Sequence, residues 1–227
     1  HLTAVIGNWV KARGKGVING IDFQSAGEID KINIPALNAI LEEGFIPIFP
    51  CIGWSSNGKP YNISSINLAA QVATELKAEK LFFLTHGKQI SNEDFFIPDN
   101  ISISPDGFVP AFSLEELDAF LELNENLGNF SIEKKHIINL LKIAKTSCSL
   151  GVSRTHIVSG LFDGTLPCEI FSDLGSGTMI YQNNYGGIRT MEKEDIPAVL
   201  NLIRPFVEQG ILLPRTEESL LQNYNEY

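Results

Sequence analysis

The sequence predicts an α/β fold, a three-layer αβα sandwich around a mainly parallel sheet. Apolar runs bounded by glycine and proline alternate with stretches of helical period, which is the pattern of parallel strands joined by crossover helices. The chain has 227 residues, 44% hydrophobic and 19% charged, enough for one large domain or for one domain and a fragment. We therefore expect a packed core with both faces of the sheet covered.

The first elements predicted along the chain are a strand, a helix and a second strand. The apolar run 2–6 predicts a strand directly at the start, so we expect an N-terminal part of the domain to be missing. A helix follows at 34–43, with Pro35 tolerated in its first turn and Gly44 suited to end it. The run 45–49 predicts a short buried strand.

A second helix and strand follow a loop. The segment 53–60 is rich in turn residues, and it leads to a helix at 68–76. The apolar run 80–85 then predicts another buried strand. Residues 34–85 thus form one helix–strand–loop–helix–strand unit.

The next segment lacks helical period. Residues 90–112 are rich in Asn, Pro, Ser and Asp, and we interpret them as a surface loop or hairpin at the rim of the sheet. Ser113 and Glu116 have the spacing of a capping box, which predicts a helix start. An amphipathic helix at 132–146 and a strand at 155–158 follow.

The C-terminal part of the sequence changes character. A helix is predicted to begin at 194–197, and after a short link at 208–210 a second helix begins near Glu217. Two helices in so short a segment cannot bury a full core alone. We therefore divide the chain into a main domain, 1–180, and an appendage or truncated domain, 188–227.

Composition narrows the class of partner. The net charge of −10 and the pI near 4.9 argue against nucleic acid, whose binding proteins carry concentrated Lys and Arg, and favour small molecules. No apolar run reaches ~18 residues, so no membrane span is predicted. Cys51, Cys148 and Cys168 are odd in number and lack metal-binding spacing, so we expect reduced, mostly buried thiols in a cytoplasmic protein without a metal site.

A ligand site is predicted where the loop 53–58 meets Asn62. Two glycines and an Asn side chain stand there between a strand and a helix, the usual ligand position in open α/β sheets, which makes Asn62 a candidate substrate-binding residue. An ordinary surface turn is the alternative. The run Tyr-Asn-Ile at 61–63 and the run Leu-Lys-Ala-Glu-Lys-Leu at 76–81 resemble the amino-acid kinase family, in particular its N-acetylglutamate kinases.

Two departures from those kinases affect the chemistry. Ile66 and His86 stand where the kinases carry acidic residues. An isoleucine cannot hold cations or organise phosphate charge, and phosphoryl transfer depends almost wholly on such positioning. We therefore expect kinase activity to be lost. The upstream blocks resemble N-acetylglutamate synthases, whose kinase-like domain is regulatory, more than kinases: 7–13, Gly16-Val17, Gly20, Asp22 and Gly27-Glu28.

The segments 154–160, 168–172 and 175–179 are similar to the arginine-feedback motif of arginine-sensitive N-acetylglutamate kinases and synthases. This resemblance implies that L-arginine binds through His156, Glu169, Gly175 and Gly177. Glu169 can take a guanidinium or ammonium, His156 can donate or accept beside it, and glycines allow close backbone approach. The alternative is a histidine satisfied by backbone, a glutamate on a helix face and a glycine-rich linker. No lysine follows the glycines, which disfavours a phosphate loop.

Residues 188–227 look like the opening strand, at Ile188-Arg189, and first two helices of the synthases' acetyltransferase domain. Arg215 lies in the segment similar to the glutamate-facing edge, and its planar fork suits a carboxylate. Alternatively, Arg215 is a solvated arginine before a helix capped by Thr216. No basic glycine-rich turn for the acetyl-CoA pyrophosphate appears before Tyr227, so we expect that loop outside this chain.

Together these resemblances imply a glutamate N-acetyltransferase of arginine biosynthesis. It would use acetyl-CoA and L-glutamate, respond to L-arginine and form a homo-oligomer, and this chain would lack the catalytic half. Two alternatives stay open, a stand-alone arginine-binding module without catalysis and an N-acetylglutamate kinase.

Overall fold

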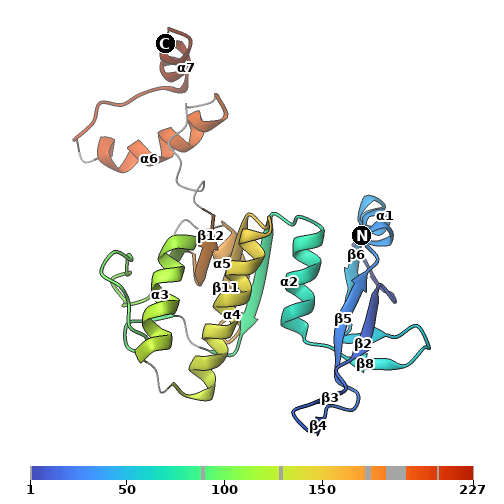
Figure 1. The fold of residues 1–227 in the computed structure, drawn as a ribbon. Helices are drawn as coiled ribbons and strands as arrows, with labels where there is room; N and C mark the ends of the chain where they lie inside the picture. Colours follow the sequence, from blue (N-terminus) through green and yellow to red (C-terminus); the bar gives the residue numbers. More distant parts are fainter. Residues whose placement is uncertain are drawn as a thin grey trace. The chain divides into compact units, whose positions relative to one another are not determined.

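The computed structural model describes residues 2–87, 90–127, 130–171, 175–182, 193–208 and 210–226. The chain divides into two compact units, His1–Tyr185 and Gly186–Tyr227. The interval between the two predicted domains, 181–187, lies mostly outside the described residues. All strands that the structure describes belong to the first unit, which contains two separate hydrophobic cores (Figure 1).

The first core lies between a small mixed sheet and two helices. Trp9, Ile32, Leu37 and Leu68 are buried there. The sheet has the order β5-β2-β7-β8, with β2 and β7 parallel and the outer pairs antiparallel. The elements of this part are β1 (Thr3–Ile6), β2 (Val10–Gly14), β3 (Val17–Ile18), β4 (Ile21–Asp22), β5 (Gly27–Ile32), α1 (Ile34–Glu42), β6 (Phe45–Ile48), β7 (Ile52–Trp54) and β8 (Pro60–Asn62).

Two expectations for this part were wrong. The segment 53–60 is not simply a loop, because β7 and β8 form an antiparallel hairpin around its turn. The run 45–49 does form a strand, β6, but its side chains are largely exposed. The physical reason is that β6 pairs only with β1 among the described residues, so that no second layer covers these apolar side chains.

The second core surrounds a sheet of order β10-β12-β11-β9. Here β9 is parallel to β11 and β10 to β12, whereas β11 and β12 are antiparallel, so the expected mainly parallel sheet is mixed. Its elements are α2 (Ser65–Glu75), β9 (Lys80–Thr85), β10 (Ala111–Ser113), α3 (Leu114–Leu127), α4 (Ile132–Ser149), β11 (Arg154–Ser159), α5 (Thr165–Phe171) and β12 (Thr178–Tyr181).

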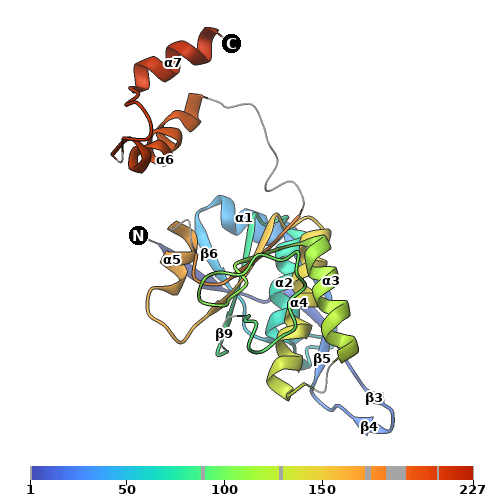
Figure 2. The same ribbon diagram turned by 90° about the vertical axis from the view of Figure 1, so that its left-hand side faces the viewer.

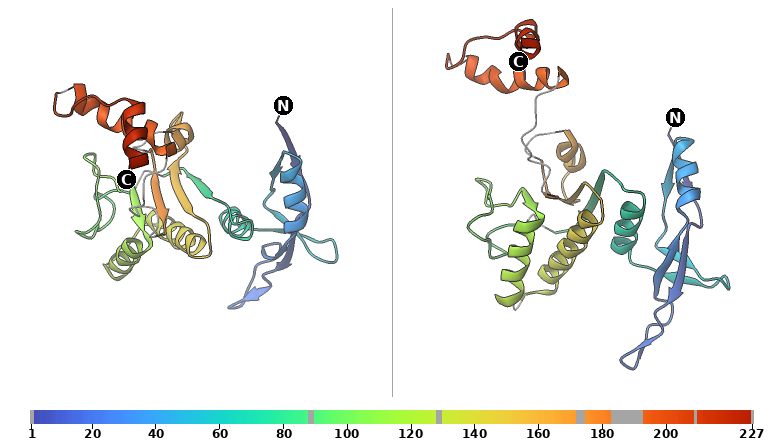
Figure 3. Two further views of the ribbon diagram at one scale, coloured as in Figure 1. Left: turned by 90° about the horizontal axis from the view of Figure 1, so that it is seen from above. Right: turned by 45° about the horizontal axis from the view of Figure 1, so that its top comes forward.

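Helices cover both faces of this sheet. Sγ of Cys148, on α4, lies 3.3 Å from Oγ1 of Thr155, whereas Glu169, on α5, contacts the neighbouring His156. Because successive strand residues point to opposite faces, α4 and α5 lie on opposite sides of β11. Figure 2 shows α5 on the side of the sheet away from α3 and α4, which lie side by side in Figure 3. The αβα arrangement expected from the sequence is confirmed.

The segment 90–112 is more than the surface loop that we predicted. Ile90, Phe95, Ile101 and Val109 are buried in the second core. The buried Asn124 anchors this excursion by accepting a hydrogen bond from the backbone N–H of Phe96 (3.0 Å) and donating one to its carbonyl (2.8 Å). The prediction failed because these apolar residues are isolated in polar sequence and have no regular spacing.

Several local predictions are confirmed. Ser113 and Glu116 form the reciprocal capping box, with N–H···O distances of 2.7 and 3.2 Å. Gly44 follows α1 at a φ of 77°, which is the left-handed conformation expected there. The thiols were predicted less well, because Cys148 is buried but Cys51 and Cys168 are exposed.

In the second unit, the two predicted helices are present as α6 (Ile196–Glu208), preceded by the 3-10 turn Lys193–Asp195, and α7 (Glu217–Glu226). Thr216 caps α7 by accepting a 3.2 Å hydrogen bond from the N–H of Ser219. The strand predicted at 188–189 lies outside the described residues. None of the helices described is long and apolar enough to cross a membrane.

Candidate functional site

The candidate site is built on β11, the strand between β9 and β12. His156 lies opposite Phe82 of β9 and Met179 of β12 in the strand register. Its ring stacks on Phe82 with centroids 4.6 Å apart and planes 13° from parallel. The stacked ring and the flat sheet hold the imidazole in one orientation, facing α5.

Glu169 meets His156 from the opposite layer. Oε1 of Glu169 lies 2.7 Å from Nδ1 of His156, and the two side chains are only 5% and 6% exposed. Oε2 accepts hydrogen bonds from the backbone N–H groups of Ser176 (2.6 Å) and Gly177 (2.9 Å). One carboxylate therefore joins a strand, a helix and the segment 175–177, and we call this arrangement the carboxylate clamp.

The two glycines of the clamp permit this close approach. Gly175 has a φ of 63°, and a Cβ there would lie 2.8 Å from Oε2 of Glu169. A Cβ at Gly177 would lie 2.4 Å from the carbonyl oxygen of Ile157, closer than real Cβ contacts. The segment can reach both the carboxylate and the backbone of β11 because no side chain intervenes.

The surroundings keep Glu169 ionised. Burial by itself raises the pKa of this carboxyl, but the hydrogen bonds from His156, Ser176 and Gly177, together with the charge of His156, outweigh it. The pKa of Glu169 is consequently lowered below its ordinary value. An ionised carboxylate only accepts hydrogen bonds, so Nδ1 of His156 must carry the proton in their contact.

The structure brings together all four residues predicted to bind arginine: His156, Glu169, Gly175 and Gly177. It also contradicts the alternative of a histidine satisfied by backbone, because the partner of His156 is a side chain. Arginine binding itself stays a prediction. The sequence analysis missed the stacking of Phe82, since nothing distinguishes Phe82 from other apolar residues of its strand.

The two predicted substrate-binding residues lie elsewhere. Asn62 ends β8 in the other sheet, where its side chain is exposed and its backbone N–H donates to the carbonyl of Ser25 (2.8 Å). Arg215 is exposed in the second unit, directly before the capping residue Thr216. Neither belongs to the clamp.

The two positions that depart from the kinases carry no acid in the folded chain. Ile66 lies in the first turn of α2 and packs against the second core. His86 is exposed directly after β9. A hydrophobic contact at position 66 cannot replace an acid that organises phosphate charge.

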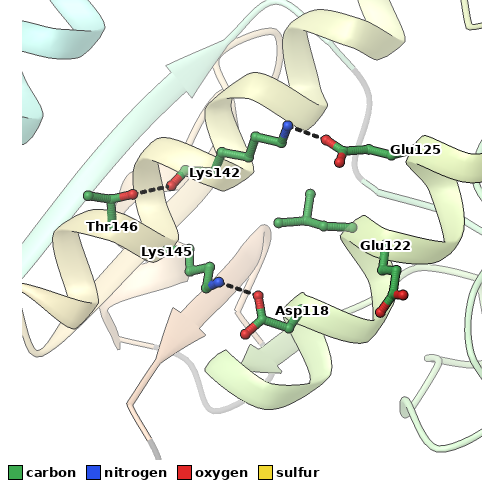
Figure 4. Close-up of a pocket in the computed structure, with 7 residues that line it drawn as sticks. Asp118, Glu122, Glu125, Lys142, Lys145 and Thr146 are labelled. Carbon is green, nitrogen blue, oxygen red and sulfur yellow. Dashed lines mark hydrogen bonds and ion pairs between the residues drawn. The ribbon is translucent and has the colours of Figure 1, made fainter.

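A groove of about 500 Å³ lies between α3 and α4 (Figure 4). Lys142 pairs with Glu125 across it, and Lys145 pairs with Asp118. These side chains are between 33% and 57% exposed, and their charges are already paired. The groove therefore offers a ligand little that solvent does not, and we do not consider it the candidate site.

A family model described as the amino acid kinase family matches residues 5–159. The chain belongs to the amino acid kinase family. His156 lies inside the matched region, whereas Glu169 and the segment 175–177 lie beyond it. The clamp is thus completed by residues outside the part covered by the family model.

Relatives within and around this family are more specific. The chain is 32% identical over its whole length to an amino-acid acetyltransferase of Shigella flexneri and covers 48% of that protein. It is similar to N-acetylglutamate synthase from Neisseria gonorrhoeae, solved with coenzyme A and L-arginine, at 34% identity and a TM-score of 0.69, covering 95% of this chain and 45% of the other. The same synthase solved with coenzyme A and N-acetyl-glutamate gives 35% identity and a TM-score of 0.66. The chain spans about half the length of the relatives it matches.

Proposed function

We propose that this chain is part of a glutamate N-acetyltransferase, an N-acetylglutamate synthase, and that the carboxylate clamp is its binding site for L-arginine as a feedback effector. The observation that carries the proposal is the buried pair of His156 and Glu169 held against the glycine segment 175–177. It is supported by the likeness to a synthase solved with coenzyme A and L-arginine.

The chemistry of the clamp suits a small cationic amino acid. An ionised, nearly buried carboxylate attracts a guanidinium or ammonium more strongly than an exposed one, because water screens it less. The glycines allow a zwitterion to meet backbone N–H and C=O groups at close range.

Phosphoryl transfer is the weaker candidate. Ile66 packs into the core and His86 is exposed, so neither position supplies the acid that this reaction requires. A coupled assay of ADP release with N-acetylglutamate and ATP should detect no turnover. Turnover that depends on N-acetylglutamate would reverse this assignment.

The proposal includes narrower expectations for the whole protein. It would act in arginine biosynthesis as an allosterically regulated, cytoplasmic homo-oligomer, and it would take acetyl-CoA and L-glutamate as substrates. Within this chain, Arg215 and Asn62 are the residues proposed to contact substrate. Arg215 can offer a planar pair of donors to a carboxylate, and its exposure leaves it accessible.

The arginine site is tested by thermal unfolding of the chain with and without L-arginine. A ligand that binds only the folded state stabilises it by about 2.7 kcal/mol at a hundredfold excess over Kd, so Tm should rise. Glu169→Gln should remove most of this rise, whereas Glu125→Gln, which changes a carboxylate in the groove between α3 and α4, should keep it. Equal responses in both variants would mean that arginine binds elsewhere.

The acetyltransferase assignment needs the longer parent protein. Thiol release from acetyl-CoA should depend on L-glutamate in the parent, and Arg215→Ala should raise the KM for glutamate. An unchanged KM would remove Arg215 from the substrate site. A gene that ends near residue 227 would instead favour the alternative of a stand-alone arginine-binding module.

A further inference from the structure

The clamp leaves one polar atom without a partner. Nε2 of His156 is fully buried and makes no hydrogen bond to any residue that the structure describes. A buried ring nitrogen without a partner is unfavourable, and in a native protein it demands an explanation such as an absent ligand. His156 is itself only 5% exposed, so this nitrogen is not simply solvated.

The carboxylate of Glu169, by contrast, is almost fully occupied. Oε2 already accepts from the two backbone N–H groups of Ser176 and Gly177, and Oε1 accepts from His156. A carboxylate offers about four acceptor positions, two on each oxygen. A guanidinium therefore cannot bind both oxygens side by side unless the segment 175–177 leaves the clamp.

The charge of His156 decides what Nε2 can bind. Since Nδ1 donates its proton to Glu169, a neutral ring has a lone pair at Nε2 and accepts a hydrogen bond from a cationic group. A protonated ring instead carries a proton at Nε2 and donates to a carboxylate. The two charge states thus select opposite ligand groups at the same atom.

Charge balance favours one of these states. A cationic ligand group, a neutral His156 and an ionised Glu169 sum to zero. A ligand carboxylate on a protonated His156 leaves one net negative charge, and a cation beside a protonated ring leaves one net positive charge. An uncompensated buried charge is costly, so the neutral combination is preferred.

Other titratable groups surround this ring. From the strand register and the alternation of side chains, the same face of the sheet carries groups from β9, β11 and β12 next to the ring, and α5 adds a thiol beside Glu169: Lys80, Arg154, Tyr181 and Cys168. Two of these are cations, which makes a protonated His156 less favourable when a further cation binds.

We propose that Nε2 of His156 is the atom that recognises the cationic group of the effector, that Glu169 acts as a positioning residue, and that the effector binds the neutral form of His156. This inference rests on the proposed arginine site and adds its direction of proton coupling. Binding to a protonated ring would require release of its proton, so affinity weakens as the pH falls.

The test is calorimetric titration of the chain with L-arginine between pH 5.5 and 8.5, the range in which histidine side chains change charge. We expect Kd to increase by up to about tenfold for each pH unit at the acidic end and to level off at the basic end. Titrations in buffers of different ionisation enthalpy should show nearly one proton released per arginine at pH 5.5 and almost none at pH 8.5.

His156→Gln gives the matched variant, because its amide can still donate to Glu169 and accept at the ligand side but does not titrate in this range. Its Kd should vary little with pH. If wild type binds arginine with a Kd independent of pH, or more tightly in acid, the inference is wrong although the arginine site stands. If wild type binds no arginine at any pH, the arginine site and the inference both fail. The wild-type proton count decides the matter even if the variant does not fold.

Discussion

The carboxylate clamp and the groove between α3 and α4 both contain ion pairs, but they differ in burial. His156 and Glu169 are 6% and 5% exposed, whereas Asp118 and Glu125 in the groove are 57% and 46% exposed. Exposed pairs contribute about 0–1 kcal/mol, because water and salt screen them and their side chains lose entropy. Breaking a buried pair on one side leaves an unpaired charge, which costs about 3–5 kcal/mol.

The number of connected segments also differs. Each pair in the groove joins only the two helices that flank it (Figure 4). Glu169 joins β11, α5 and the segment 175–177 through three hydrogen bonds. The volume of a hollow and the number of charges around it are therefore poor guides to a functional site, and a buried polar group with an unused valence is a better one.

The largest expected effect is that of Glu169→Ala. This change removes the acceptor from His156 and from two backbone N–H groups, so the free energy of unfolding should fall by about 3 kcal/mol. Urea unfolding followed by circular dichroism measures it, with Glu125→Ala as the control that should lose less than about 1 kcal/mol. Similar losses in both variants would remove the difference between the two regions.

Gly177→Ala tests whether close backbone approach holds the clamp together. Its Cβ would lie 2.4 Å from the carbonyl oxygen of Ile157 and 2.5 Å from Cγ1 of Val158, so the segment must move. We expect a loss of about 1–3 kcal/mol, as for other overpacked sites, and a weaker response to arginine. Gly164→Ala is a useful comparison, because Gly164 has a positive φ but a Cβ added there would meet no atom within 4 Å, so this variant should lose stability from backbone strain alone and keep its arginine response. An unaltered arginine response in Gly177→Ala would argue against the site.

Acid should weaken the clamp before it affects the groove. The folded-state pKa of Glu169 is lowered, so its contribution to stability is complete above the ordinary carboxyl pKa and is lost as the pH falls through the folded value. Between about pH 5 and pH 3, Tm of wild type should therefore fall more steeply than Tm of Glu169→Gln. Parallel curves for the two proteins would show that the clamp contributes nothing to the pH dependence.

The smallest effects are expected on the lysine side of the groove. Lys142→Ala and Lys145→Ala each break one exposed pair, and each should lower the free energy of unfolding by less than about 1 kcal/mol. Added salt should shrink even this difference, because it screens exposed charges. A loss of about 2 kcal/mol or more would exceed what exposed ion pairs contribute and would place the groove in the same class as the clamp.

Prediction from sequence succeeded where the determining contacts are local. The helix starting after Ser113 follows from a residue pair three positions apart, and the end of α1 follows from Gly44 alone. It failed for the segment 90–112 and for the strand at 45–49. Burial in those regions depends on what the rest of the chain places over them, which neither segment encodes by itself.

The sequence by itself determined the α/β class, the positions of most helices and the four residues of the candidate arginine site, because each depends on residue type and short-range spacing. Only the tertiary structure decided that His156 and Glu169 form a buried pair. They are 13 positions apart, and their contact requires α5 to fold back over the face of the sheet opposite α4. That same folding shields Nε2 of His156 from water, and it is this burial that turns an ordinary histidine into a candidate sensor of ligand charge.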